Sequence, residues 1–391
     1  MLYGDYIGNL IGFEDIIIKD VKNVFGQTHI YLQIEKRIHE CPRCGHTTSK
    51  VHDYRHQVIK DIPSFGQDTY LHLRKRRHVC PECGKRFYED VDFLPRYHRM
   101  TNRLYAHIIS AFRDTLAIKH IAQKENVSIT TAMRIFDKVD HAKPRLPEAI
   151  SIDEFRGNTD GEKFQCILTD PRYKKVLDIL PDRKSETLYG YFSSFNNRSE
   201  VKYVIIDMSN SFREVAHRCF PKAKVIADRY HVVRQVVWAF ENVRKEEQKK
   251  FADSRRKYFK RSRQVLLKHA DKLQDDEITQ VEIMLKTSDR LRHAYHILQD
   301  FYRIMDSANS QIARKRFSWW VMKVESFDLP EFYPCLRAFR RWSKEILASM
   351  DIDLSNGYTE GVNNKIKVLK RVSYGVRNFK RFRNRILCCM Q

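Results

Sequence analysis

Four acidic residues stand at points of this sequence where a folded chain would hold them rigidly. Asp153 closes the apolar run AISID, Asp207 closes VKYVIID, Asp228 closes AKVIAD, and Glu360 lies far downstream in SNGYTEGVNNK. Carboxylates from separate elements can converge on two divalent cations, and such a pair supports in-line phosphoryl transfer. Hard oxygen ligands suit Mg²⁺ or Mn²⁺. Glu154 should point away from Asp153, because successive strand residues face opposite sides.

The elements that would position these acids follow one another between Ala149 and His231. Apolar runs predict strands at AISIDEF, FQCILTD, KKVLDILP, VKYVIID and AKVIAD, and helical spacing predicts helices at SETLYGYFSSF and SFREVAHRCF. The order is β-β-β-α-β-α-β. We therefore expect an α/β sheet domain that presents acids at the ends of its strands.

Two near-identical cysteine pairs occur earlier, in CPRCG and CPECG. Two such knuckles form a closed four-sulfur site for structural Zn²⁺, with Cys41, Cys44, Cys80 and Cys83 as ligands. A redox function is the alternative for either pair alone, and His46 and His78 are alternative ligands. Nine cysteines in this arrangement favour a reducing compartment and a metal over disulfides.

Between the pairs, LHLRKRRH alternates and then becomes strongly basic. This segment is either a solvated strand edge or a strand that contacts phosphates. We favour phosphate contact through Arg74, Lys75, Arg76 and Arg77.

Residues 101–140 change to helical spacing. A helix through Leu104 and Ile108, a short helix AIKHIAQKEN, and a third helix N-capped by Ser128 fit a helix-turn-helix. That unit would bring Thr130, Thr131 and Arg134 to a major groove. An ordinary three-helix packing unit is the alternative.

The composition points to a polyanionic partner. Lys and Arg number 72 against 49 acids, a formal net charge of +23, and the charge is clustered. A merely basic protein is the alternative. We expect no membrane span, because no apolar run of about 18 residues occurs. We expect no signal peptide, because MLYGDYIGNL lacks a basic start and a long apolar core.

Beyond His231 the chain should be helical almost throughout to about residue 325. Glycine is absent between Gly190 and Gly357, and proline is absent between Pro221 and Pro330. The basic stretch 241–272 is either a solvated helix face or a face toward DNA. We expect core positions for Trp319, Trp320 and Trp342.

The last segment combines an acid with a basic surface. Ser355 and Asn356 should cap a helix that begins near Tyr358, and on it Glu360 should share a face with amides and a lysine. From residue 361 onward there are nine Lys and Arg and no acid. We expect DNA contacts in this tail from Asn363, Lys367, Lys370, Arg371, Arg377, Lys380 and Arg381.

Matched in order, these motifs resemble a known group. The chain is similar to bacterial insertion-sequence transposases of the DDE type, specifically the ISL-three family. The resemblance rests on the paired CPxCG knuckles, the helix-turn-helix, IDEF, DMSNSFREVAHRCFPKAKVIADRYHV and NGYTEGVNNKIKVLKR. It implies a ribonuclease H-like catalytic core interrupted by an all-helical insertion before its last helix.

The resemblance also implies residue roles. Asp153, Asp207 and Glu360 would be the catalytic acids that hold Mg²⁺ or Mn²⁺, and Asp228 and His231 would support the site. Strand counting favours Asp207 over Asp228 as the second acid, and the choice stays open. The division it implies is a zinc-binding domain (1–95), a helix-turn-helix (96–142), a first catalytic part (143–231), the helical insertion (232–350) and a last catalytic part with the basic tail (351–391).

The implied activity is binding of terminal inverted repeats, followed by two-metal cleavage and strand transfer of DNA. Pairing of two DNA ends implies a homodimer or a larger assembly, and the implied location is the bacterial cytoplasm, at the nucleoid. Two alternatives remain: a DNA nuclease, and a regulator that binds DNA without catalysis. The regulator would leave the spaced carboxylates without a role.

Overall fold

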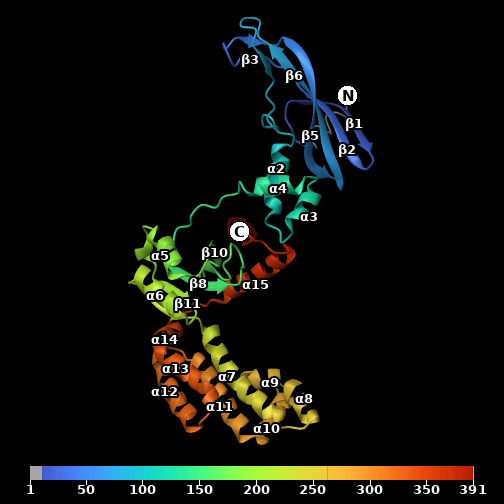
Figure 1. The fold of residues 1–391 in the computed structure, drawn as a ribbon. Coiled ribbons are helices and arrows are strands. Elements are labelled where there is room, and N and C mark those ends of the chain that lie inside the picture. The colour runs from blue at the N-terminus through green and yellow to red at the C-terminus, as the bar shows by residue number, and fades with distance from the viewer. Residues whose placement is uncertain (1–10, 262, 391) are drawn as a thin grey trace.

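The computed structural model describes residues 11–261 and 263–390. The molecule is elongated: a first sheet occupies one end, three short helices follow, a second sheet lies in the middle, and a helical part forms the other end (Figure 1). None of the described helices combines the length and apolar character needed to cross a lipid bilayer. The expectation about a signal peptide concerns residues 1–10, which lie outside the described residues.

The first sheet has the strand order β1-β2-β6-β5, with β7 paired to β6. Its buried face is built from alternate residues such as Leu71 and Leu73 on the central strand. A separate two-stranded sheet, β3-β4, adjoins the first cysteine knuckle. The strands are β1 (Ile16–Val24), β2 (Gln27–Ile34), β3 (His39–Glu40), β4 (Thr47–Thr48), β5 (Val51–Ser64), β6 (Gln67–Val79) and β7 (Arg86–Tyr88).

Three helices follow the first sheet: α2 (Asn102–Ala111), α3 (Ile118–Lys124) and α4 (Ile129–Phe136). The expected cap is confirmed, because the Ser128 side chain accepts a hydrogen bond from the Thr131 amide at 3.1 Å. The helices enclose a small core around Phe112 and Phe136, to which Cys388 from the far end of the chain also belongs.

The second sheet has the order β10-β9-β8-β11-β12. Strands β8, β9 and β10 pair antiparallel, whereas β11 runs parallel to both β8 and β12. The expected order of strands and helices is observed. The elements are β8 (Ala149–Phe155), β9 (Gln165–Asp170), β10 (Lys175–Leu180), α5 (Ser185–Ser193), β11 (Tyr203–Ile206), α6 (Asn210–Cys219) and β12 (Lys224–Ala227).

Helices cover both faces of this sheet. Ile150 and Ile152 of β8 pack with α5 and α6, whereas Phe155 packs with α15 (Gly357–Val372) and α16 (Phe379–Met390). Ile205 and Ile226 contact Ala348 of α14. Alternate residues of each strand are therefore buried on opposite sides, which explains the near-continuous apolar runs.

The helical part confirms the expectation drawn from the missing glycines and prolines. It comprises α7 (Arg229–Lys249), α8 (Asp253–Arg261), α9 (Arg263–Leu267), α10 (Asp275–Lys286), α11 (Asp289–Met305), α12 (Ser310–Ser326), α13 (Tyr333–Arg341) and α14 (Ser343–Asp351), with 3-10 turns at Ala270–Lys272 and Pro330–Phe332. Trp320 and Trp342 are in its core, as expected. Trp319 is 72% exposed, so its predicted core position was wrong: on a helix, adjacent residues point about 100° apart.

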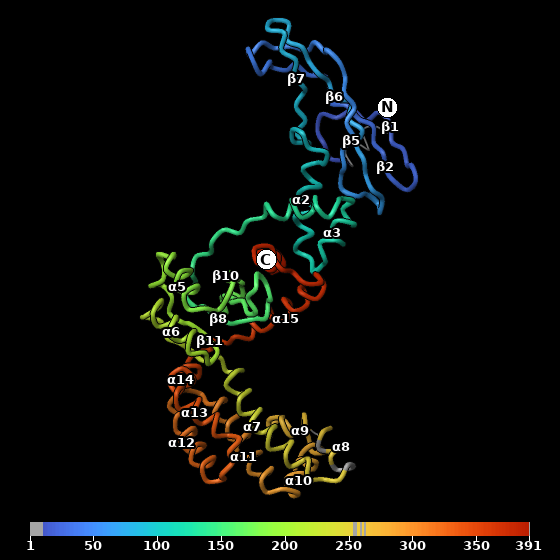
Figure 2. Tube along the Cα trace, in the orientation of Figure 1, coloured from blue at the N-terminus to red at the C-terminus, as the bar shows by residue number. Residues whose placement is uncertain are grey.

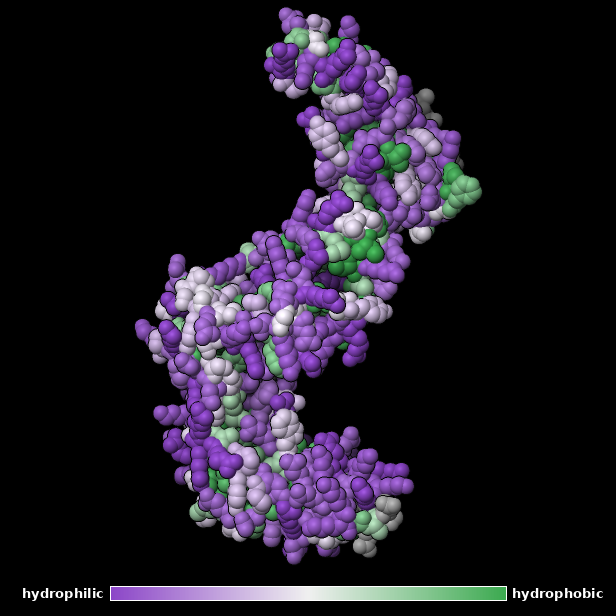
Figure 3. All heavy atoms as spheres, in the orientation of Figure 1, coloured by the Kyte–Doolittle hydropathy of each residue, from purple (hydrophilic) through white to green (hydrophobic). Residues whose placement is uncertain are grey.

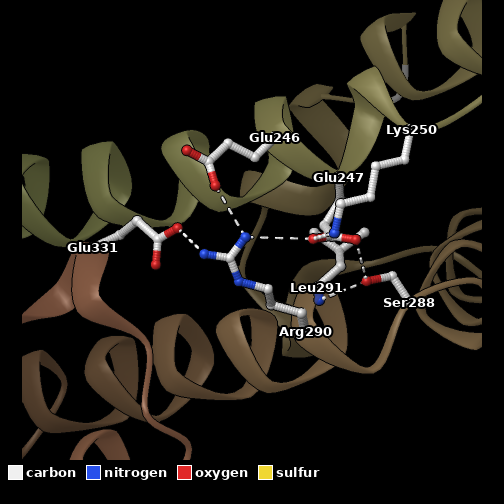
Figure 4. A network of polar contacts seen from close by, with 7 residues as sticks. All are labelled: Glu246, Glu247, Lys250, Ser288, Arg290, Leu291 and Glu331. Carbon is white, nitrogen blue, oxygen red and sulfur yellow. Dashed lines mark hydrogen bonds and ion pairs between the residues drawn. The ribbon is translucent and has the colours of Figure 1, made fainter.

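One arginine joins three segments of this part. The Arg290 guanidinium donates to Glu246 at 2.9 Å and to Glu331, and it lies 3.4 Å from Glu247, which also accepts from Ser288 (Figure 4). The contacts connect α7, α11 and the turn at Pro330–Phe332. Shared carboxylates around one planar cation fix the relative orientation of these helices.

The last helix returns to the middle of the molecule. Figure 2 shows the trace passing from α15 back toward α2 and α3. On α16, Arg385 donates to the backbone oxygens of Phe112, Asp114 and Leu116, and Arg383 pairs with Asp178 on β10 at 2.6 Å. The basic C-terminal segment is thus largely a packed helix that joins the helix-turn-helix to the second sheet, rather than a free tail.

Candidate functional site

Three aspartates lie at the same level of adjacent parallel strands of the second sheet: Asp153 within β8, and Asp207 and Asp228 directly after β11 and β12. Ile206 of β11 pairs with Ile152 of β8 and with Ala227 of β12, so the next residues, Asp153, Asp207 and Asp228, lie side by side. Parallel strands present their carboxyl ends at one edge of a sheet. Local sequence thus supplies each acid, and the strand register brings them together.

Helix α15 brings Glu360 to this edge. Its N-terminal residue Asn356 accepts from Ser151 and donates to Asp153 Oδ2 at 3.4 Å, and Asn363 donates to the same oxygen at 3.0 Å. Asn356 was expected to cap the helix through its side chain. It does not, because its amide is fully buried against β8 and takes its partners there.

A second contact forms a compact acid–imidazole cluster. His231 lies in the first turn of α7, and its Nδ1 is 2.7 Å from Asp228 Oδ2. Ligand atoms of Asp228, His231 and Glu360 lie within 4.8 Å of one another. Asp228 directly follows β12 and His231 lies three residues later on α7, whereas Glu360 comes from α15, more than a hundred residues further along the chain.

Burial and the crowding of negative charge shift the pKa values of these groups. Burial, together with the charge of Asp153, raises the pKa of Asp207 to about 6. Burial also raises the pKa of Asp153 and of Glu360, and the charge of Asp228 adds to both. Burial would lower the pKa of His231, but the bond to Asp228 outweighs it and the pKa is raised. Concentrated carboxylates of this kind are stabilised by a nearby cation.

The donor set fits a hard divalent cation. Among the described residues, Asp207 Oδ1 and Asn363 Oδ1 are buried without a hydrogen-bond partner. Asp207 follows β11, the neighbour of the strand that carries Asp153, and Asn363 lies on α15, the helix that carries Glu360. Buried oxygens without donors require a partner such as a cation. Glu154, by contrast, turns away and pairs with Arg183.

The cysteine knuckles form a second, separate metal site. Sγ atoms of Cys41 and Cys83 lie 3.6 Å apart, as do those of Cys44 and Cys80, and all four cluster within 4.8 Å. A tetrahedron with Zn–S bonds of about 2.3 Å has edges of about 3.8 Å, so the four sulfurs fit Zn²⁺. His78 clusters instead with His39 and Glu89.

The four basic residues of β6 lie in different environments. Arg76 was expected to contact phosphate, but this prediction was wrong: the side chain is 3% exposed and its guanidinium binds Glu89 at 2.9 Å. Arg77 pairs with Asp53 at 2.7 Å. Arg74 is exposed and stacks on Tyr54, and Lys75 lies over Tyr88. Arg74 and Arg76 share one side of the strand, so the position of Glu89, and not the strand period, decides which of them is buried.

The remaining residues that the sequence predicted to contact DNA differ in their exposure and in their partners. Thr130 and Arg134 are exposed on α4, and Thr131 is half-buried beside Ser128. Arg381 pairs with Asp137 at 2.7 Å, and Asn363 belongs to the carboxylate site rather than to an outer surface. Lys370 donates to the Arg156 backbone oxygen. The exposed members of the C-terminal set are Lys367, Arg371, Arg377 and Lys380.

Sequence reasoning missed three polar side chains that dock α15. Ser151 donates to Asn356, and the hydroxyls of Thr169 and Thr359 lie 2.7 Å apart, all of them buried. Polar residues at strand positions that should be apolar were the available signal. The two strand residues have their partners at the start of α15: Ser151 bonds to its N-cap residue Asn356, and Thr169 bonds to Thr359.

Comparison with known proteins finds matches to family models in three parts of the chain. The transposase model of family ISL3 matches residues 150–386, a zinc-finger model of the transposases of IS204, IS1001, IS1096 and IS1165 matches 37–83, and the helix-turn-helix model of family ISL3 matches 89–140. The chain belongs to the ISL3 family of transposases. The two smaller matches confirm a zinc ribbon and a helix-turn-helix ahead of a transposase domain of mixed α/β and helical content.

Individual relatives carry the same name. A transposase for insertion sequence element IS1001 from Bordetella parapertussis is 26% identical over 366 residues, which cover 90% of this chain and 89% of the relative. A transposase for element IS1557 from Mycobacterium tuberculosis is 22% identical over 257 residues, or 59% and 57% of the two chains. The transposase identity does not favour a nuclease or a regulator without catalysis.

Proposed function

We propose that the second sheet and its helices form a ribonuclease H-like catalytic core, with residues 232–350 inserted before its last helix. The strand order β10-β9-β8-β11-β12, antiparallel in its first three strands and parallel thereafter, supports this architecture. We further propose the division 1–95, 96–142, 143–231, 232–350 and 351–391. The sharp change from strands to short helices and then to the second sheet supports it.

Asp153, Asp207 and Glu360 are the proposed catalytic acids, with Asp228 and His231 in support. One observation carries the proposal: Asp153 and Asp207 lie level with each other on adjacent parallel strands, and the helix of Glu360 is fastened to Asp153 through Asn363. Asp228 is already engaged by His231. This engagement and the unpartnered Oδ1 of Asp207 favour Asp207 as the second acid.

These acids would hold Mg²⁺ or Mn²⁺. When bound, such cations activate the attacking oxygen and stabilise the leaving 3′-oxygen of DNA. The residues of the chain then have distinct tasks. Asp153 is held in one orientation by two amides, Glu360 faces the same edge from α15, and Asp228 orients His231 beside Glu360. No serine or tyrosine nucleophile is proposed.

Recognition is assigned to the zinc ribbon and the helix-turn-helix. We propose that they bind the terminal inverted repeats of the element, that the exposed residues of β6, α4 and α15 contact phosphates, and that two or more chains pair the DNA ends. The formal charge of +23 supports a polyanionic partner. The proposed place of action is the bacterial cytoplasm, at the nucleoid.

Substitution of each acid tests the catalytic assignment. Asp153→Asn, Asp207→Asn and Glu360→Gln should each abolish cleavage and joining, because each removes both a charge and a ligand. Binding of the DNA ends should remain nearly intact. Cleavage and joining are measured by a gel assay with Mg²⁺, and binding of the DNA ends is measured in a separate binding assay.

Glu154→Gln is the matched control, since it neutralises the neighbouring carboxylate, which pairs with Arg183 away from the site. This variant should cleave at close to the normal rate. If Asp207→Asn cleaves normally while Asp228→Asn is inactive, Asp228 is the second acid. If all three proposed acids can be neutralised without loss, the catalytic assignment is wrong.

A further inference from the structure

Helix α7 carries an exposed stripe of two aromatic rings with an arginine between them. Tyr230 and Trp238 are 52% and 55% exposed, and the Arg234 guanidinium lies 5.6 Å from the centre of the first ring and 4.6 Å from that of the second. Residues four apart share a helix face. More than half of each ring stays open to solvent, although α7 otherwise buries its apolar residues.

The stripe is continuous with the carboxylate site. Tyr230 stands two residues after Asp228 and next to His231, on the first turn of the helix. The positive charge of Arg234 acts on Glu360 and opposes the rise in the pKa of Glu360 that burial causes. The surface is hollowed between the second sheet and the far end of the helical part (Figure 3), and α7 runs along this hollow from one to the other (Figure 1).

The exposed charged side chains on this face are positive. Within the described part of the chain, Arg234 makes no ion pair with a carboxylate. Beyond Trp238, the same face continues through Asn242, Lys245 and Lys249, which are exposed. The 21 residues of α7 span about 30 Å. Cations guide a polyanionic backbone, and open aromatic faces offer stacking surfaces for bases.

We propose that the Tyr230–Arg234–Trp238 stripe binds an unpaired stretch of DNA strand next to the phosphate that is cleaved, with bases stacked on the two rings and Arg234 on the backbone. A fully paired duplex cannot use these rings, because its base faces are already stacked. The site therefore selects a melted or distorted junction between element and flanking DNA. This inference rests on the proposed function for the location of the cleaved phosphate.

The test compares paired and unpaired junctions without chemistry. The full chain is bound, in Ca²⁺ or without divalent cations, to two DNA ends that differ only in having two mismatched pairs at the junction. The wild-type chain should prefer the mismatched end, and Trp238→Ala should reduce that preference about 10- to 100-fold, in line with the loss of one stacking partner. Trp238→Phe should largely restore it. A 2-aminopurine at the junction should be quenched by the wild-type chain and bright with Trp238→Ala.

Trp319→Ala is the matched control, since Trp319 is another exposed tryptophan, on α12, and is more exposed than Trp238 (72% against 55%). It should retain the preference for mismatched ends, and both variants should unfold at the wild-type temperature. The inference is overturned if Trp238→Ala keeps the full preference, or if it changes only the mass of the assembly, which would make the stripe a contact between copies. Because the assay requires no cleavage, its result is independent of which carboxylates cut.

Discussion

Single side chains decide how the acids are held. Asp153 is 5% exposed, and its carboxylate accepts hydrogen bonds from the Glu154 amide at 2.7 Å and from Asn356 and Asn363. A buried charge without donors would be strongly destabilising. The two asparagines therefore serve as positioning residues: they fix the carboxylate and, through it, the distance between β8 and the helix of Glu360.

Replacing one of these amides should impair chemistry more than DNA binding. Asn363→Ala removes the closer donor to Asp153, and we expect cleavage to fall about 10- to 100-fold, as is common for groups that orient metal ligands. The Mg²⁺ concentration required for half-maximal cleavage should rise, while the affinity for DNA ends stays unchanged.

Asn364→Ala provides the control, because Asn364 is the exposed neighbour on the same helix. Its cleavage rate and Mg²⁺ requirement should match the wild type. Equal effects of the two substitutions would show that Asn363 acts only through the stability of α15.

At the scale of elements, the two cysteine knuckles repeat one backbone turn. Gly45 and Gly84 have φ angles of +73° and +69°, and each donates its amide to the first cysteine of its pair, at 2.9 and 3.0 Å. Glycine adopts this left-handed conformation without strain. The turns hold the four sulfurs together, although β3, β4 and the ends of β5 and β6 contribute few apolar contacts there.

Zinc should therefore be required for the folding of this element. We expect one Zn²⁺ per chain by metal analysis, and Cys44→Ser should lose the metal, unfold the zinc ribbon and weaken binding of DNA ends. His46→Ala should keep both the metal and the binding, because His46 is exposed and lies outside the cysteine cluster. A folded, metal-free protein that binds DNA fully would contradict this prediction.

At the scale of the whole molecule, α16 joins the helix-turn-helix to the second sheet, the parts to which we assign recognition and chemistry. It follows the helix that carries Glu360, pairs with β10 through Arg383, and supplies Cys388 to the core of the helix-turn-helix. The Arg381–Asp137 pair adds a contact at the end of α4. A fragment ending near Lys143 would contain the zinc ribbon and the helix-turn-helix but would lack the α16 contacts.

Arg385 is the residue on which the contact between α16 and the helix-turn-helix should depend most. It is 3% exposed and serves three backbone carbonyls that would lose their donor in Arg385→Ala. We expect a loss of roughly 2 to 5 kcal/mol in the free energy of unfolding, measured by chemical denaturation, and weaker specific binding of DNA ends.

Arg381→Ala is the comparison on the same helix. Its ion pair is more than a third exposed on both sides, and such pairs contribute about 0 to 1 kcal/mol. If both substitutions cost the same, the buried carbonyl contacts do not hold the helix-turn-helix in place.

Much of this protein was determined by local sequence. Residue types at short spacing predict four features: the two CPxCG pairs, the Ser128 cap, the succession of strands and helices along the chain around Asp153, and the helical stretch without glycine. All of these features are found in the structure. Local patterns succeed here because turn geometry, capping and apolar periodicity act within a few residues.

Tertiary structure decided which polar residues meet. Arg76 and Arg74 are two residues apart, yet one is buried against Glu89 and the other is exposed, and Asn356 bonds to β8 instead of its own helix. Partners such as Ser151 and Asn356 are 205 residues apart. Such pairs form only after the sheet register and the docking of α15 are set, because hydrogen bonds and ion pairs depend on distance in space, not on spacing along the chain.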